Sequence, residues 1–225
     1  MKRSTINQAI NQAIPFFQIH QIFLPEFAYF TVSDWQEKRK DYDEVKKTSL
    51  GWDVTDFGSG DFQRIGRTIF TLRNGSHKSK KYPKSYALKI MFLQEGQKSP
   101  IHYHKMKMED IINQSGGKIS ICFWKSGSDH SLSKDDLVIS KDGKQVEVFA
   151  GQQVILKPGE SVCVVPNTYH QFWALEGSGA VVSGEVSSVS NDMTDNFFLM
   201  PAKRFPIVEE DQPRKYLLCS EYELS

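Results

Sequence analysis

The chain has 225 residues, of which 39% are hydrophobic, and its 28 basic and 27 acidic residues leave a formal net charge of +1. This balance offers no basic surplus for nucleic acid, and no apolar run approaches the ~18 residues that a membrane helix needs. The length is ample for one domain with a substantial core. After Lys2 and Arg3 the N-terminus turns polar, without the apolar segment of a signal peptide, so we expect a cytoplasmic protein.

Two helices are predicted in the first fifty residues. Apolar residues recur at helical spacing over 4–13, which predicts a helix that Pro15 ends. Ser33 opens a capping box, which predicts a charged helix that reaches about Lys47. The apolar stretch Ile14–Phe30 predicts a homodimer interface, because exposed apolar strips often mark interfaces; alternatively, it covers one sheet of the same chain.

From Leu50 onward the pattern predicts strands with Gly, Pro and Asn-Gly turns between them. The predicted strands are 52–57, 68–72, 86–93, 118–124, 145–149, 153–156, 161–165, 170–175 and 180–186. Many short strands favour an all-β jelly roll or sandwich. Because no internal repeat or low-complexity linker is present, we expect a single domain over 1–225. It comprises a helical extension (1–50), a β-barrel (51–186) and a loop-rich segment (187–225) that packs on the barrel.

Two histidines and a glutamate indicate a metal site. His102 and His104 are two residues apart, so in an extended strand both imidazoles leave the same face. Glu109 follows five residues later, far enough for the chain to bend and return a carboxylate to that face. Such a triad suits a divalent metal and leaves coordination positions open for a substrate. The alternative is a surface strand that carries two unrelated histidines.

Two ionisable residues lie in apolar strands. Lys89 is in the middle of 86–93, and a lysine is rarely buried without a partner. It either reaches the rim of the sheet or points into a polar pocket with a carboxylate partner. Glu185 lies in 180–186, where apolar surroundings would raise the pKa of its carboxyl and suit a general base. A purely structural role for Glu185 is the alternative.

Two short motifs resemble those of the cupin superfamily. The first is Gly96-x5-His102-x-His104-x4-Glu109-x6-Gly116, and the second is represented by Gly159, Pro166 and His170. The wider chain, from its Asn/Gln-rich start through Phe205-Pro206, resembles the cupin-type D-lyxose ketol-isomerases over nearly its whole length. This resemblance implies a cupin jelly-roll barrel with additional N-terminal helices, and His170 as a further metal ligand.

The resemblance also implies an activity, a metal-dependent interconversion of D-lyxose and D-xylulose, with D-mannose and D-fructose as a second pair. Glu185 would shuttle the proton through an enediol, although a direct hydride shift remains an alternative. The resemblance favours the pocket position for Lys89, which would orient or neutralise the enediolate. Asp195 and Arg204 would contact sugar hydroxyls or complete the pocket floor. Oxygen chelation favours Mn²⁺, while Zn²⁺ would bind the same ligands more tightly and Co²⁺ is a third candidate.

Two other classes of function remain open, because a fold does not determine an activity. A cupin dioxygenase would hold Fe²⁺ in the same ligands and take up oxygen. A non-catalytic sugar- or metal-binding cupin would bind its ligand without turnover, and replacement of Glu185 would leave that property intact.

Overall fold

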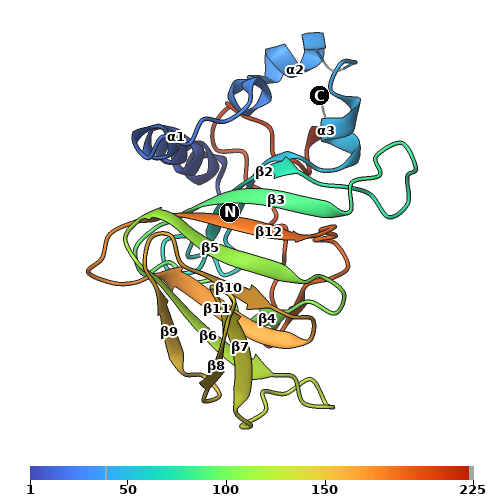
Figure 1. The fold of residues 1–225 in the computed structure, drawn as a ribbon. Coiled ribbons are helices and arrows are strands. Elements are labelled where there is room, and N and C mark those ends of the chain that lie inside the picture. Colours follow the sequence, from blue (N-terminus) through green and yellow to red (C-terminus); the bar gives the residue numbers. More distant parts are fainter. Residues whose placement is uncertain (39, 223–225) are drawn as a thin grey trace.

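The computed structural model describes residues 1–38 and 40–222, which form two antiparallel sheets with helices on the outer face of one (Figure 1). The larger sheet has the order β1-β2-β3-β12-β5-β10-β7-β8 and the smaller one β13-β4-β11-β6-β9. The predicted all-β fold with N-terminal helices is therefore confirmed. No helix in the described ranges is long and apolar enough to cross a membrane.

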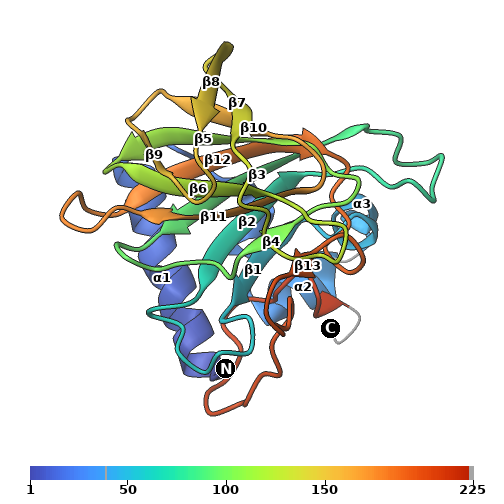
Figure 2. The ribbon, with the colours of Figure 1, turned by 90° about the horizontal axis from the view of Figure 1, so that it is seen from below.

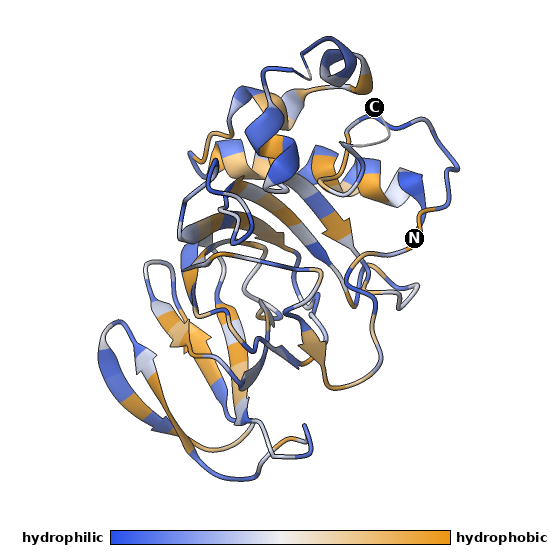
Figure 3. Cartoon of the chain, turned by 90° about the vertical axis from the view of Figure 1, so that its right-hand side faces the viewer, coloured by the Kyte–Doolittle hydropathy of each residue, from blue (hydrophilic) through white to orange (hydrophobic). Residues whose placement is uncertain are grey.

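The strand bounds agree with most of the predicted strands to within about two residues at each end. They are β1 (Gly51–Thr55), β2 (Arg67–Arg73), β3 (Tyr86–Leu93), β4 (His102–Tyr103), β5 (Glu109–Gly116), β6 (Ile119–Lys125), β7 (Leu137–Lys141), β8 (Lys144–Val148), β9 (Gln153–Leu156), β10 (Ser161–Val164), β11 (Thr168–Ala174), β12 (Val181–Ser188) and β13 (Phe197–Phe198). Hydrophobic and hydrophilic residues alternate along several strands, as Figure 3 shows.

The interior between the sheets is apolar at one end and polar at the other. Successive side chains of a strand point to opposite faces, so Lys89, Met91 and Leu93 of β3 share one face. Met91 and Leu93 belong to the core between the sheets. Lys89 is paired in register with Glu185 of β12. The same strand faces that build the core thus carry charged groups to one end of the interior, where the histidines also lie.

The helices lie on the face of the larger sheet that points away from the smaller sheet (Figures 1 and 2). Helix α1 (Arg3–Ile19) includes Pro15, so the prediction that Pro15 ends it is wrong. A proline in a helix interior costs about 3 kcal/mol. Beyond it, Phe16 packs against Phe92 and the buried Phe17 stacks on Trp52. Fully burying Phe17 gives about 1.5–3 kcal/mol, and the partly buried Phe16 adds to this, which together offset that cost.

The predicted second helix begins earlier and is divided. Thr31 caps α2 (Val32–Lys38), because its Oγ1 accepts from the Asp34 N–H at 3.3 Å while the Asp34 carboxylate accepts from the Thr31 N–H at 2.8 Å. A separate α3 (Asp43–Lys47) follows. The intervening turn lets the Tyr42 ring pack edge-on against Phe30 and Trp35. Residue 39 of the predicted helix lies outside the described residues.

The described part of the segment after β12 is mostly loop and returns to the start of the chain. Leu218 forms a parallel bridge with Trp52 of β1, and Glu209 forms one with Lys2. The buried Arg3 guanidinium pairs with the carboxylates of Glu210 and Glu221. The predicted segment continues to 225, but residues 223–225 lie outside the described part of the chain.

The apolar stretch Ile14–Phe30 includes the short 3-10 helix η1 (Glu26–Tyr29). It mainly covers this chain's own sheet. Only parts of it stay on the surface: Ile19 is 78% exposed and Phe23 is 74% exposed. A homodimer therefore stays a prediction that depends on these two side chains.

We expect light scattering at micromolar concentration to give the mass of a dimer, because association would bury Ile19 and Phe23. Phe23→Ser should shift the population toward monomer. Phe149→Ser, at another exposed aromatic residue, is the matched control and should not. A monomer mass for the unaltered protein would contradict the expectation.

Candidate metal centre and active site

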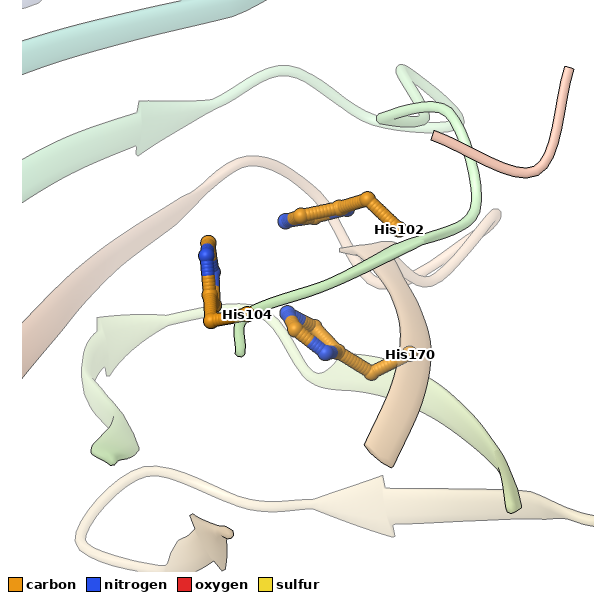
Figure 4. A group of neighbouring side chains, drawn as sticks. All are labelled: His102, His104 and His170. Carbon is orange, nitrogen blue, oxygen red and sulfur yellow. The ribbon is translucent and has the colours of Figure 1, made fainter. Parts of the chain in front are cut away.

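Three histidines from two adjoining segments converge at the polar end of the interior. His102 of β4 pairs with His170 of β11, and His104 follows directly after β4. Their ligand nitrogens all lie within 4.8 Å of one another, and Figure 4 shows the rings pointing toward one another. The structure thus brings together the three histidines that the two motifs suggested.

The hydrogen bonds of these histidines determine which nitrogen is free. Each Nδ1 lies within hydrogen-bond distance of a backbone carbonyl, which only accepts, so each Nδ1 carries the proton and each Nε2 carries a lone pair. The carbonyls are those of Pro100 at 2.9 Å from His102, Asp195 at 2.6 Å from His104 and Thr168 at 3.1 Å from His170. Within the described residues the buried Nε2 of His170 has no hydrogen-bond partner.

The imidazoles of His102 and His104 are held in the neutral form that binds metals. Burial lowers the pKa of His102 well below its usual value, and neighbouring His170 and His104 lower it further. Burial also lowers the pKa of His104, with a contribution from the ammonium of Lys107.

Glu109, the first residue of β5, brings a carboxylate to the histidines. Its Oε1 lies 3.0 Å from Nε2 of His170 and 3.5 Å from Nε2 of His104. Burial by itself would raise the pKa of Glu109, but the ammonium of Lys107 holds it well below the usual value. The Glu109–His170 approach is not a hydrogen bond, because Nε2 carries no proton. Facing lone pairs repel unless a cation neutralises them, so this donor set fits a divalent metal.

Lys107 links the two carboxylates of the site, and sequence reasoning missed it. Its Nζ donates to Oε2 of Glu109 at 2.5 Å and to Oε1 of Glu185 at 2.9 Å. Burial lowers the pKa of Lys107, but Glu109, Glu185 and Asp192 together raise it above its usual value. The available signal was its position two residues before Glu109, which places both on one face of an extended segment.

Lys89 occupies the polar pocket and does not reach the sheet rim. Its Nζ lies 3.3 Å from Oε1 of Glu185 and donates to Oγ of Ser190 at 2.9 Å. The pocket alternative is therefore confirmed for Lys89. The premise of apolar surroundings for Glu185 is wrong, because two ammonium groups lie against one of its oxygens.

Arg204 comes from the C-terminal segment and lines the same cavity. Its Nη2 donates to Asp192 at 2.8 Å and to Asp53. Burial alone would raise the pKa of Asp192, but Lys89 and Arg204 hold it well below the usual value. The buried Nη1 of Arg204 has no partner in the described chain, which leaves it free to donate to a ligand.

Asp195 supports the site from behind. Its carboxylate accepts from the backbone N–H groups of Lys105, Met106 and Lys107 at 2.8, 3.1 and 2.9 Å. The interpretation of Asp195 as a sugar contact is therefore not supported, since its oxygens are directed to this loop. The cavity is instead lined by Asp192 and Asn196.

Two neighbouring cavities share part of their walls. The inner one, of about 40 Å³, has His102, His104, Lys107, Glu109 and Glu185 in its wall. The outer one, of about 680 Å³, is the larger and contains none of these groups. Their walls share Phe57 and Ser99. The chemistry thus lies in the smaller space, and the larger one lies next to it.

Asp195→Ala should loosen the loop that carries Lys107 and the carbonyl that orients His104. We expect Co²⁺ affinity to fall about 10- to 100-fold and the free energy of unfolding to fall by about 1–3 kcal/mol. Absorption titration and denaturant unfolding measure the two effects. Asp211→Ala, which removes an exposed carboxylate that accepts from Ser4, is the control. Unchanged metal affinity with only a raised KM would restore the sugar-contact interpretation.

Comparison with known proteins shows the family of this chain. Residues 1–222 match the family model described as D-lyxose isomerase. The D-lyxose/D-mannose isomerases of Escherichia coli O157:H7 and Serratia proteamaculans are 44% and 46% identical over 223 residues, covering 99% of this chain and 98% of each relative.

The fold is also similar to that of solved sugar isomerases. The L-ribose isomerase of Acinetobacter sp. DL28 superposes with a TM-score of 0.63 at 16% identity, covering 93% of this chain and 98% of that one. At this identity the likeness shows the fold alone, and it confirms the predicted cupin-type barrel. Both the family model and the two relatives match almost the whole chain. This protein therefore belongs to the D-lyxose isomerase family and is a sugar aldose–ketose isomerase.

Proposed function

We propose that this enzyme interconverts D-lyxose and D-xylulose, with D-mannose and D-fructose as a second pair, and that it uses one divalent metal ion. The two relatives, both D-lyxose/D-mannose isomerases, support these sugars. The single observation that supports the metal is the convergence of three histidine Nε2 atoms beside the Glu109 carboxylate. The ligand nitrogens lie within 4.8 Å of one another.

The metal ligands in this proposal are His102, His104, Glu109 and His170. When bound, the ion supplies Lewis-acid stabilisation to the charge that develops on the sugar oxygens. A carboxylate ligand and oxygen donors from the sugar favour Mn²⁺, with Zn²⁺ and Co²⁺ as the alternatives.

The protein's own groups manage the proton and the charge. Glu185 removes a proton from C2 and returns it to C1 through an enediol, because of the two glutamates in the cavity wall it is the one that is not placed against the histidines. Lys107 and Lys89 hold this carboxylate and stabilise negative charge on the enediolate oxygens. Arg204 donates its free Nη1 to a sugar hydroxyl. A hydride shift between C2 and C1 would need the lysines but not the base.

D-Lyxose and D-mannose share the part of the sugar that the proposed site would bind. D-Lyxose and D-mannose have the same configuration at C2 and C3, the carbons next to the reacting carbonyl. A site that binds O1, O2 and O3 therefore tolerates the extra hydroxymethyl group of mannose better than inversion at C2.

Purified protein should contain about one divalent metal per chain, and EDTA should remove it together with activity. Elemental analysis measures the content. The double variant His102→Ala/His104→Ala should lose the metal, whereas His77→Ala, at an exposed histidine, should keep it. Stoichiometric metal in the double variant would refute the ligand assignment.

The Mn²⁺-loaded protein should form ketose from D-lyxose and, more slowly, from D-mannose. In Glu185→Gln we expect kcat to fall by about 10²–10⁴ while the metal content is unchanged, because only proton transfer is lost. The exposed Glu147→Gln on β8 is the matched control.

These outcomes separate two parts of the proposal. Absence of ketose from both sugars would reject the substrates. Full kcat in Glu185→Gln would reject only the base and favour the hydride shift.

A further inference from the structure

The inner cavity is too small for a whole sugar. At about 40 Å³ it holds only a few water-sized groups. A pentose with its C1 and C2 beside the histidines must therefore extend into the next space, and the outer cavity of about 680 Å³ adjoins it. The shared wall residues, Phe57 and Ser99, lie where the sugar would pass from one cavity to the other.

Ser99 carries a buried hydroxyl without a partner at this passage. The residue is 2% exposed. Its Oγ neither donates nor accepts a hydrogen bond within the described chain. An unpaired buried polar group costs about 1–3 kcal/mol, so such groups are normally satisfied by a ligand or by ordered water.

The backbone around Ser99 is fixed independently of its hydroxyl. The Ser99 carbonyl accepts from Nε2 of Gln171 at 2.6 Å. Two residues earlier, the Gln97 carbonyl accepts from Nη1 of the buried Arg67 at 3.0 Å. These bonds position the Ser99 side chain without using it, which is the arrangement expected for a group reserved for a ligand.

Phe57, the other shared residue, offers only an apolar surface. Its φ of +54° is strained for a bulky residue. This backbone is held by its N–H, which donates to Oγ1 of Thr55 at 2.9 Å, and by its carbonyl, which accepts from the Lys203 N–H at 2.9 Å. The ring packs against Phe198. Of the two residues at the passage, only Ser99 can bind a hydroxyl.

We propose that Ser99 Oγ hydrogen-bonds a hydroxyl at the far end of the sugar, on C4 or C5, and that it is a specificity residue for the polyhydroxylated chain. This inference rests on the proposed function for the position of the carbonyl end. Ser99 does not touch the reacting atoms, so it acts on binding and not on proton transfer.

The test is a thermodynamic cycle in which the Ser99 hydroxyl and one sugar hydroxyl are removed separately and together. The kcat/KM of the Mn²⁺-loaded protein is measured for D-lyxose and for its 4-deoxy and 5-deoxy analogues, in the unaltered protein and in Ser99→Ala. One deoxy analogue should lose about 3- to 10-fold in the unaltered protein and less than about twofold in Ser99→Ala. Comparing ratios between proteins cancels differences in ring opening among the sugars.

Two controls separate binding from structure. Ser99→Ala should raise KM for D-lyxose with kcat changed less than about threefold. Thr68→Val removes another buried hydroxyl without a partner, one that is outside the walls of both cavities. It should leave the penalties for the deoxy sugars as they are in the unaltered protein.

A binding assay keeps this inference separate from the activity. Calorimetry with the pentitol obtained by reducing D-lyxose, and with its 4-deoxy and 5-deoxy counterparts, needs no turnover. If the binding penalty of a deoxy pentitol depends on Ser99 while no ketose is formed, the contact is supported and the proposed function is rejected. Equal penalties in the unaltered protein and Ser99→Ala, for both analogues, would overturn the role of Ser99 whether or not ketose is formed.

Discussion

The site depends on one constraint, that charges buried at the polar end of the barrel must be paired. Lys107 satisfies two carboxylates at once, Glu109 on β5 and Glu185 on β12. Removing one partner of a buried pair typically costs about 3–5 kcal/mol, because the remaining charge is left uncompensated. The ammonium therefore joins the carboxylate beside the histidines to the carboxylate proposed as the base, and it fixes how far apart they lie.

The segment after β12 completes this end of the barrel. Asp192 and Arg204 close the charge network there, and Asp195 holds the loop before β5 through three backbone N–H groups. The segment is itself attached to α1, where Glu210 and Glu221 pair with the buried Arg3. The helix, the tail and the histidine end of the barrel therefore form one connected set of contacts, although the residues lie far apart in the sequence.

Local patterns were reliable for the strands and less so for the helices. A nearly continuous apolar run located β3 to the residue, because the strand is covered on both faces. Pro15 is a strong local signal for the end of a helix, yet the packing of Phe17 on Trp52 outweighs it. The position of that tryptophan relative to the helix is set by tertiary packing, which a local pattern does not contain.

The sequence by itself identified His102 and His104 as candidate metal ligands, since their spacing places them on one face. It also established that Lys89 needs a partner if buried. Only the tertiary structure decided that Lys107 bridges two carboxylates, that Asp195 serves the backbone of a loop, and that the Ser99 hydroxyl stays unpaired beside the passage. Residue spacing fixes which side chains share a face, whereas pairing between distant segments depends on how the sheets and the tail pack together.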